Sequence, residues 1–284
     1  MEINYSKLHG LGNDFIVIDN RDCEIVGHHN EFARSICDRH FGVGADGLML
    51  VNCSDKADFK MTLYNSDGGE AEMSGNGIRC FAKYVYEKMD PKKELFSVDT
   101  KAGIILPAII LKDKKVVAIE VDMGAPHFKR SEIPMKGKES SLVLDEELKV
   151  DDSSFKINLA NMGNPHCVIF VTDLGKVDIG KWGPRIENHQ LFPERINVHF
   201  VQVINDKEIS MLTWERGVGE TLACGTGASA SVALANKSKR TGKRVLVHTP
   251  GGNLIIELND ENHVILTGPA EFISSGVYYY GQPS

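Results

Sequence analysis

Residues 61–77, MTLYNSDGGEAEMSGNG, and residues 211–227, MLTWERGVGETLACGTG, are two versions of one pattern. Aligned, Met61, Gly69, Glu70, Gly75 and Gly77 fall on Met211, Gly219, Glu220, Gly225 and Gly227, and Ser74 falls on Cys224. Each copy begins as a β-rich run and ends in a glycine-rich turn that opens a helix-like segment. A helix start leaves backbone N–H groups unpaired, which favours a bound anion or a thiolate. Two such sites facing each other could act on the two faces of one carbon.

The composition is that of an ordinary globular protein. The chain has 284 residues, of which 42% are hydrophobic and 25% charged. The net charge of -7 argues against nucleic acid or an anionic membrane as partner. No apolar run approaches the length of a membrane span, and the first ten residues lack the apolar centre of a signal peptide, which predicts a cytoplasmic protein. The 6 scattered cysteines do not resemble a disulfide framework, and neither CxxC nor HExxH points to a metal.

Periodicity predicts the secondary structure of most of the chain. Strands are expected at 3–8, 14–19, 48–51, 61–65, 95–98, 103–111, 116–122, 167–171 and 211–215. Helices are expected at 30–40, with Asn30 as N-cap, and at 76–89, with Asp90-Pro91 as the stop. The run Gly42–Gly47 fits GxGxxG, but a helix precedes it and a strand follows it. A dinucleotide fingerprint needs the opposite order, so that interpretation is rejected.

Further landmarks repeat at a nearly constant offset of 149 to 151 residues. Gly12-Asn13 matches Gly163-Asn164, Phe41 matches Phe192, and 98–103 matches 247–252. This predicts an internal duplication of two α/β halves, each a rolled, mainly antiparallel sheet around a central helix. The polar stretch 124–141 is the expected crossing, which gives an N-terminal half of 1–123 plus 269–284 and a C-terminal half of 124–268. The site is expected in the cleft where the halves meet.

Seven motifs together carry a resemblance that spans nearly the whole chain. They are Lys7–Phe15 (KLHGLGNDF), Asn65-x-Asp-Gly, Gly75-Asn-Gly-x-Arg-Cys80, Met162–His166 (MGNPH), Phe192-Pro-Glu-Arg-x-Asn197, Trp214–Gly217 (WERG) and Ala223–Gly227 (ACGTG). With these motifs the chain resembles the diaminopimelate epimerases. The resemblance implies a cofactor-independent isomerase that interconverts LL- and meso-diaminopimelate in the biosynthesis of lysine and peptidoglycan precursors. It also implies two pseudo-symmetric halves, in agreement with the repeat.

The resemblance assigns roles to particular residues. Two cysteines at helix starts act as base and acid on opposite faces of the α-carbon, and Cys224 and the position of Ser74 correspond to them. Backbone N–H groups of Gly75, Asn76, Gly225 and Thr226 are expected to hold the substrate carboxylate. The side chains implied in substrate binding are Asn13, Asn65, Asn164, Asn197, Glu215 and Arg216. His166 and Glu215 are expected to tune the pKa of the thiols.

Two positions depart from the family pattern. Ser74 stands where the family has a cysteine, and a hydroxyl is far less acidic than a thiol of pKa about 8.5, so we expect the chain to be impaired or inactive. A substitution introduced to trap an inactive form and a natural variant with changed chemistry both explain it, and the intact remaining motifs favour the first. Cys80 lies in the second turn of the helix and does not replace the missing thiol. Gly47 stands where some members have Gln, which puts that substrate contact in doubt.

Other interpretations stay open at this stage. The chain could racemise another amino acid, act as a one-base lyase with Cys224, or bind diaminopimelate without catalysis. The several polar side chains around a second substrate end argue against a racemase of a simpler amino acid. The sequence does not define the oligomeric state, and a homodimer is one possibility. The partner expected in every case is a small molecule.

Overall fold

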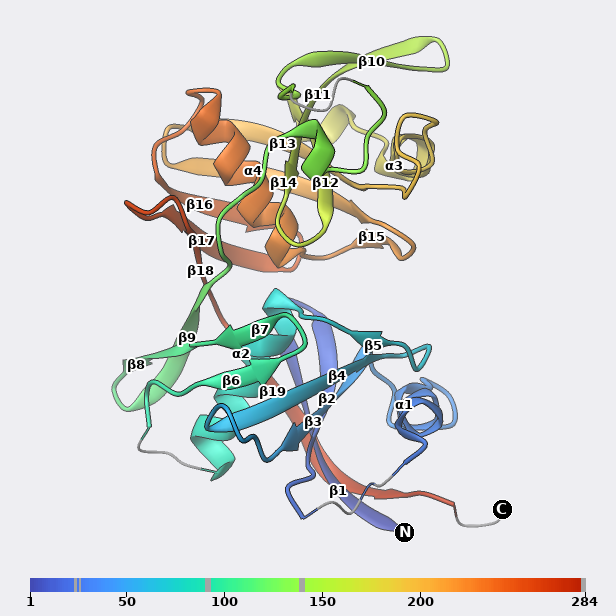
Figure 1. Ribbon diagram of the computed structural model, residues 1–284, viewed down its shortest axis with the longest axis vertical. Helices are drawn as coiled ribbons and strands as arrows, with labels where there is room; N and C mark the ends of the chain where they lie inside the picture. Colours follow the sequence, from blue (N-terminus) through green and yellow to red (C-terminus); the bar gives the residue numbers. More distant parts are fainter. Residues whose placement is uncertain (23–24, 26, 90–92, 138–140, 282–284) are drawn as a thin grey trace. The chain divides into compact units, whose positions relative to one another are not determined.

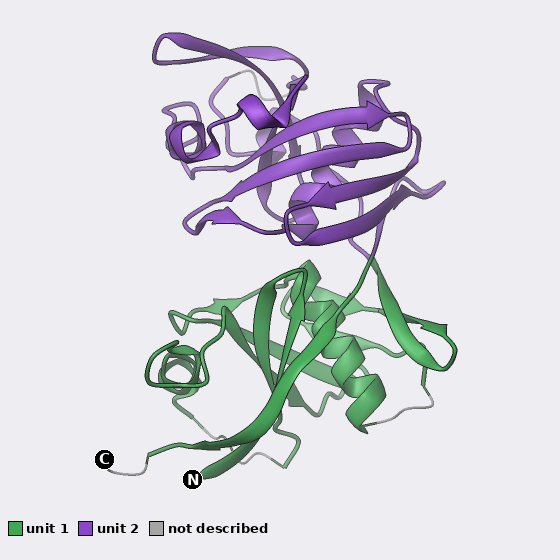
Figure 2. Ribbon diagram, turned by 180° about the vertical axis from the view of Figure 1, so that it is seen from behind, with its two compact units in different colours: residues 1–121, 268–284 green, residues 122–267 purple. Residues whose placement is uncertain are grey.

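The computed structural model describes residues 1–22, 25, 27–89, 93–137 and 141–281. The chain forms two compact units, Met1–Val121 with Gly268–Ser284 and Asp122–Thr267 (Figure 2). The units thus divide after Val121 and after Thr267, whereas the sequence places the crossings after Met123 and Gly268.

Unit 1 is a sheet packed against one long helix (Figure 1). Its strand order is β19-β1-β2-β3-β4-β6-β7, and β5 pairs with β4. The strands of this sheet are β1 (Glu2–Gly10), β2 (Asn13–Asp19), β3 (Gly47–Asn52), β4 (Phe59–Asn65), β5 (Glu70–Ala71), β6 (Val98–Thr100), β7 (Gly103–Ile105) and β19 (Glu271–Tyr279). Strands β8 (Ala108–Lys112) and β9 (Lys115–Asp122) pair with each other and lie outside this strand order. The helices are α1 (His29–Cys37) and α2 (Gly75–Tyr84), which continues as the π-helical turn η1 (Val85–Met89). The apolar side of α2 expected from periodicity, with Ile78, Phe81, Ala82 and Val85, is fully buried.

Unit 2 repeats this plan. The sheet order runs β10-β11-β12-β13-β14-β16-β17-β18, and β15 pairs with β14. The strands are β10 (Glu146–Val150), β11 (Ser153–Asn161), β12 (Pro165–Val171), β13 (Asn197–Asn205), β14 (Glu208–Glu215), β15 (Gly219–Thr221), β16 (Arg244–Thr249), β17 (Gly252–Leu258) and β18 (Val264–Gly268). The helices are α3 (Ile179–Glu187), α4 (Gly225–Lys237) and the short 3-10 turns η2 (Arg130–Glu132) and η3 (Leu174–Lys176). Helix α4 packs against β11, β12, β13 and β17 and is buried almost all round, which its Gly, Ala and Ser residues permit.

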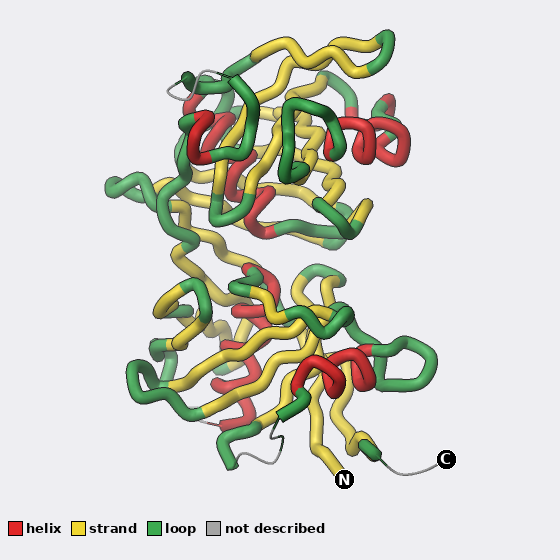
Figure 3. The backbone as a smooth tube through the Cα atoms, turned by 45° about the vertical axis from the view of Figure 1, so that its right-hand side comes forward, coloured by secondary structure: helices red, strands yellow, loops and turns green. Residues whose placement is uncertain are grey.

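The strand pairings confirm the duplicated fold. In unit 1 the series β2-β3-β4-β6-β7 is parallel, antiparallel, parallel and antiparallel, and the series β12-β13-β14-β16-β17 in unit 2 is the same. The side-chain detail repeats as well, since Thr100 Oγ1 donates to Gly103 O at 2.7 Å and Thr249 Oγ1 donates to Gly252 O at 2.8 Å. Figure 3 shows the helices of each unit, in red, among its strands, in yellow. The sheets are mixed, with antiparallel pairs in the majority.

Seven of the expected strands lie within observed ones, and two expected ranges are wrong. Of the range 95–98, only Val98 belongs to a strand, which is β6 (Val98–Thr100). The range 103–111 is divided into β7 and β8 by Leu106-Pro107, since proline has no N–H to continue a ladder. The expected helix stop at Asp90-Pro91 lies outside the described residues.

Helix α1 differs from its expected form at both ends. His28, in the left-handed region at φ 45°, precedes the helix without a side-chain cap, so Asn30 is not the N-cap. The helix ends at Cys37 because the N–H groups of Val43 and Gly44 bond back to the carbonyl of Ile36. The sequence also favours a packing role for Cys23, Cys37, Cys53 and Cys167. Cys37 and Cys167 are buried, Cys53 is exposed, and Cys23 lies outside the described residues.

Candidate active site

The two glycine-rich turns have the same cap geometry. Ser74 precedes α2 with φ −137° and ψ 125°, and its Oγ accepts a hydrogen bond from the N–H of Gly77 at 3.0 Å. Cys224 precedes α4 with φ −126° and ψ 112°, and its Sγ accepts from the N–H of Gly227 at 3.4 Å. Each side chain thus satisfies one of the unpaired N–H groups of its helix. The sequence correspondence between Ser74 and Cys224 is therefore also a structural one.

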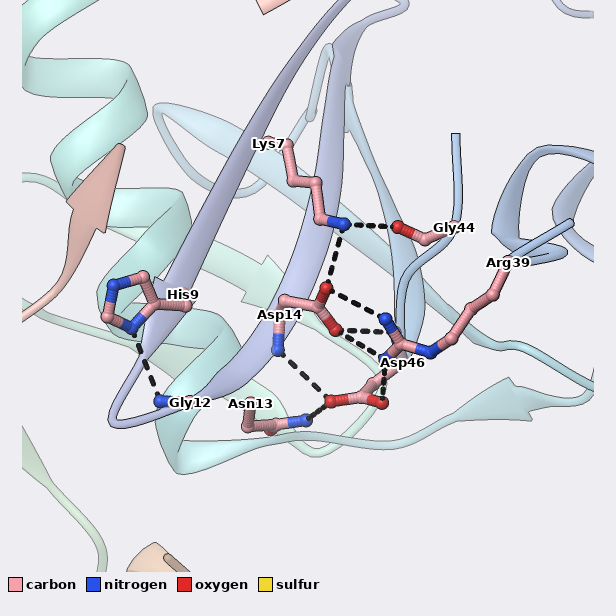
Figure 4. Close-up of polar contacts among 8 residues, drawn as sticks. All are labelled: Lys7, His9, Gly12, Asn13, Asp14, Arg39, Gly44 and Asp46. Atoms are coloured by element: carbon pink, nitrogen blue, oxygen red, sulfur yellow. Dashed lines mark hydrogen bonds and ion pairs between the residues drawn. The ribbon is translucent and has the colours of Figure 1, made fainter. Parts of the chain in front are cut away.

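Asn13 lies at the start of β2, and both polar atoms of its amide are hydrogen-bonded; Figure 4 shows the bond to Asp46. Asn76 Nδ2 donates to Asn13 Oδ1 at 3.3 Å, and Asn13 Nδ2 donates to Asp46 Oδ2 at 2.7 Å. Asp46 immediately precedes β3, the parallel neighbour of β2, so strand pairing brings it beside Asn13. The chain of donors fixes the orientation of the Asn13 amide.

A network of two cations and two carboxylates holds Asp46 in place (Figure 4). Arg39 Nη2 bonds to Asp46 Oδ1 at 2.8 Å and to Asp14 Oδ1 at 2.9 Å, and Lys7 Nζ lies 2.9 Å from Asp14 Oδ2. Burial raises the pKa of Asp14, but the hydrogen bonds from Arg39 and Lys7 outweigh it and leave that pKa below its usual value. Asp14 therefore stays ionised, and the network is neutral as a whole.

Asn65 and Gly47 are paired across β4 and β3. Asn65 ends β4 with an exposed side chain, and its N–H bonds to Gly69 O at 2.8 Å. A Cβ at Gly47 would lie 2.8 Å from the Tyr64 carbonyl oxygen and 3.2 Å from the ring of Phe15. This backbone thus accommodates glycine at position 47 and would have to move for the glutamine of some family members.

Cys224 has the surroundings of a neutral thiol. Burial raises its pKa well above the usual value, and the charge of Glu215 raises it further. Hydrogen bonds from Thr226, whose Oγ1 lies 3.4 Å from Sγ, and from the N–H of Gly227 lower the pKa. They do not offset the increase caused by burial and Glu215. A hydrogen bond between the thiol and the Glu215 carboxylate also favours the protonated form. The helix start thus favours the thiolate through the N–H of Gly227, as expected, but burial and Glu215 outweigh it and keep the thiol protonated in the unliganded protein.

His166 is the middle of a buried chain of hydrogen bonds. Its Nε2 lies 2.7 Å from Asn164 Oδ1, its Nδ1 lies 2.9 Å from His199 Nε2, and His199 Nδ1 lies 3.1 Å from Thr213 Oγ1. Burial lowers the pKa of His166 well below its usual value and that of His199 to about 3, so both rings are neutral. One arrangement of protons satisfies every contact: Thr213 donates to His199, His199 to His166, and His166 to Asn164.

Asn197 and Arg216 lie together at the ends of adjacent strands. Asn197 Nδ2 donates to Pro165 O at 2.8 Å, and the N–H of Arg216 donates to Asn197 Oδ1 at 2.9 Å. The Arg216 guanidinium donates to Glu194 O at 3.1 Å. The loop after β14 is anchored by Glu187, whose carboxylate accepts from Gly217 N–H at 2.8 Å and from other donors.

The structure groups the expected residues within each unit. In unit 1, Asn76 and Asn13 are bonded beside the Ser74 cap, while Asn65 is exposed at a strand end. Unit 2 contains three groups. The first is Cys224 with Glu215, Thr226 and Gly225; the second is Asn164 with His166; the third is Asn197 with Arg216. Both ring nitrogens of His166 are engaged by Asn164 and His199, so its expected effect on a thiol stays a prediction.

Sequence reasoning missed several supporting side chains, which are Arg39, Asp46, Arg79, Glu187, His199 and Thr213. His199 could have been found, because it lies two residues after Asn197 and so points to the same face of β13. Arg79 stands in the quoted motif Gly75–Cys80 without an assigned role, although two of its acceptors lie in its own helix. The others were hidden, since their partners come from other strands or loops.

No cluster of three or more His, Cys, Asp or Glu side chains suited to a metal ion occurs in the described part of the chain. Within the same residues, the structure contains no helix with the length and apolarity to cross a membrane.

Comparison with known proteins gives matches over nearly the full length. The family model described as "Diaminopimelate epimerase" matches residues 5–129 and 158–273. The chain is 48% identical to the diaminopimelate epimerase of Pelotomaculum thermopropionicum over 281 residues, covering 98% of this chain and 99% of that protein. It is 45% identical to the diaminopimelate epimerase of Methanothermobacter thermautotrophicus, covering 97% and 98%.

Solved structures show the same fold at low identity. A PhzF-family phenazine biosynthesis protein of Bacillus anthracis superposes with a TM-score of 0.72 at 17% identity, covering 98% of this chain and 99% of that one. A hydroxyproline epimerase of Agrobacterium vitis superposes with a TM-score of 0.72 at 15% identity, covering 97% and 90%. With the family model and the relatives in agreement, the chain belongs to the diaminopimelate epimerase family.

Proposed function

We propose that this chain acts on the substrate for which its family is named. It interconverts LL- and meso-diaminopimelate, in the biosynthesis of lysine and peptidoglycan precursors. The enzyme is an isomerase of the racemase and epimerase class. The observation that carries the proposal is the matched pair of helix caps, Ser74 on α2 and Cys224 on α4, with the same backbone conformation. A reaction that inverts one carbon needs one group for each face, and a duplicated cap supplies them.

The proposed reaction moves one proton off the α-carbon and one onto it. A base takes the α-proton from one face, and the electron pair passes toward the substrate carboxylate. An acid then delivers a proton to the opposite face, and the roles reverse in the other direction. The N–H groups of Gly75, Asn76, Gly225 and Thr226 would stabilise the charge that develops on the carboxylate, since they belong to helix starts.

Cys224 enters this scheme as the proton donor. It is a thiol in the unliganded protein, for the reasons of burial and charge given above. To act as base it must first lose its proton, and Glu215 is the group already hydrogen-bonded to it. We therefore propose that Glu215 receives that proton when the reaction runs in the other direction.

Ser74 limits the chain to one effective thiol. Its hydroxyl caps α2 well but has a pKa several units above that of a thiol, so it is a poor base at neutral pH. We propose that the chain as it stands is impaired in epimerisation while the rest of the site is kept.

The remaining expected residues are proposed to hold the substrate. They are Asn13, Asn65, Asn164, Asn197, Glu215 and Arg216. The orientations of Asn13 and Asn164 are already set by Asp46 and His166, which supports a binding role because an ordered donor loses less entropy on binding. The guanidinium of Arg216 can take a carboxylate with two parallel hydrogen bonds.

The test is the Ser74→Cys substitution. We expect epimerisation to rise by roughly 10²–10⁴-fold, the contribution typical of one general acid or base. Substrate affinity should change little, and Cys224→Ser in the restored background should abolish turnover again. Full-speed epimerisation by the unaltered chain would show that another group is the second base.

Proton exchange in deuterated water separates this proposal from its alternatives. With one thiol, the unaltered chain should exchange the α-proton of one stereoisomer without inverting it. Binding without exchange of either stereoisomer would favour a binding protein, and release of ammonia would favour a lyase.

We further propose that the protein acts in the cytoplasm and that, with substrate bound, the two units bring position 74 and Cys224 to opposite faces of one carbon. A crystal structure with diaminopimelate would test this placement. Light scattering on the purified chain would test whether it forms a homodimer.

A further inference from the structure

Arg79 is a buried arginine whose partners are all neutral. It lies on α2 with no exposed surface. Its Nη1 donates to Gly75 O at 2.7 Å, its Nη2 to Asn76 Oδ1 at 2.8 Å, and its Nε to Pro269 O at 3.1 Å. Two of these acceptors belong to the first turn of α2, and the third belongs to the segment in which the chain re-enters unit 1. The guanidinium therefore lies directly beneath the turn that Ser74 opens.

The charge of Arg79 is not neutralised by the described residues, none of whose carboxylates forms an ion pair with it. Burial lowers its pKa to about 10, so it remains protonated at neutral pH. A buried cation without an ion pair is costly, and such a cost is usually offset where the charge has a use.

Most other charges on α2 and on the elements packed against it occur in pairs, and the remaining ones, Glu2 of β1 and Lys88 of η1, are exposed. The pairs are Lys83 with Glu87, Lys7 with Asp14, Arg39 with Asp14 and Asp46, Arg21 with Asp19, and His9 with Glu271. Arg79 is thus the buried positive charge that remains at the start of α2.

Unit 2 has no such charge at the matched position. Ser229 stands there in α4, is fully buried, and its Oγ has no hydrogen-bond partner among the described residues. The nearby ionisable group is instead Glu215, whose negative charge adds to the effect of burial in raising the pKa of the Cys224 thiol. The two matched caps therefore have opposite electrostatic surroundings, positive in unit 1 and negative in unit 2.

We propose that Arg79 is a positioning residue that makes the start of α2 the anion-favouring member of the pair. It does so in two ways: it orients the Asn76 amide, and its charge adds to the positive end of the helix. This inference deepens the proposed function and rests on it for the identity of the anion, which is either the substrate carboxylate or a thiolate at position 74.

The test uses the thiol of the full-length Ser74→Cys, Cys224→Ala variant as a probe of the local potential. The rate of alkylation by iodoacetamide is followed against pH, and mass spectrometry identifies the modified peptide. In this background we expect Arg79→Met to lower the alkylation rate near neutral pH by about tenfold, since loss of one nearby charge raises the thiol pKa by about one unit. Arg79→Lys keeps the charge and should stay within about twofold of the background.

Lys83→Met is the matched control, because it removes a charge from the same helix that Glu87 already neutralises. It should leave the alkylation profile unchanged. Arg79→Gln keeps an N–H donor without the charge and takes the place of Arg79→Met if that variant does not fold. A folded Arg79→Met or Arg79→Gln variant with the background profile would overturn the proposal. The readout does not depend on turnover, so a failure of Ser74→Cys to epimerise would count against the proposed function and leave this test intact.

Discussion

Gly227 offers a sharp test of how the second cap is built. A Cβ added there would lie 2.2 Å from His199 Cε1 and 2.6 Å from Nε2, well inside the van der Waals limit. His199 is fully buried and held by His166 on one side and Thr213 on the other, so it has no room to give way. The glycine is needed here for the close approach of α4 to the imidazole.

The expected effect of Gly227→Ala has the opposite sign from the usual one. Glycine to alanine within a helix ordinarily stabilises by roughly 0.5–1 kcal/mol. Overpacking of a core typically costs about 1–3 kcal/mol, and a contact this short belongs at the upper end. We therefore expect the free energy of unfolding to fall by about 1–3 kcal/mol, which for a unit of this size lowers Tm by roughly 2–4 °C per kcal/mol.

Gly77→Ala is the matched control in the other repeat. Its Cβ would meet Ser74 Cβ at 3.1 Å and Ser74 Oγ at 3.4 Å, contacts that a small shift relieves. We expect its stability to stay within about 1 kcal/mol of the parent. Both tryptophans, Trp182 and Trp214, lie in unit 2, so urea unfolding followed by tryptophan fluorescence reports on Gly227→Ala, and circular dichroism reports on both variants. Equal stabilities for the two variants would show that His199 does not restrict the residue at position 227.

Two further predictions follow from charges in unit 2. Glu215→Gln should lower the pKa of the Cys224 thiol, because the carboxylate raises it, and iodoacetamide should then alkylate Cys224 faster at neutral pH; an unchanged rate would show that burial alone keeps the thiol neutral. His248 Nε2 lies 2.6 Å from Glu208 Oε1, and this hydrogen bond raises the pKa of His248 and lowers that of Glu208. The pair should stabilise fully between pH 4.5 and 6.5, weaken as pH rises through the raised histidine pKa, and weaken again as pH falls through the lowered glutamate pKa. His248→Gln should remove the loss of Tm on the alkaline side, and an identical pH profile in both proteins would contradict this.

The repeat is readable from the sequence because its signals are local. A glycine-rich turn after a β-rich run marks a helix start whatever surrounds it, so the sequence alone pairs Ser74 with Cys224. The strand at 14–19 and the buried side of the helix at 76–89 are readable for the same reason, since periodicity records which face is buried. Helix ends are less readable: His28 and not Asn30 precedes α1, because a backbone conformation rather than a capping side chain begins it.

The family, the duplication and the identity of the residues at the two helix starts follow from the amino-acid sequence. The electrostatic character of those helix starts depends on the folded units. Cys224 follows the local rule for a lowered thiol pKa, yet burial and Glu215 raise it, and both depend on strands far away in the chain. In the sequence, Arg79 cannot be distinguished from an exposed polar residue of a helix. Only the folded unit shows that it is buried among neutral acceptors. Burial and charge pairing sum over neighbours that are distant in sequence, and for that reason they cannot be read from a local pattern.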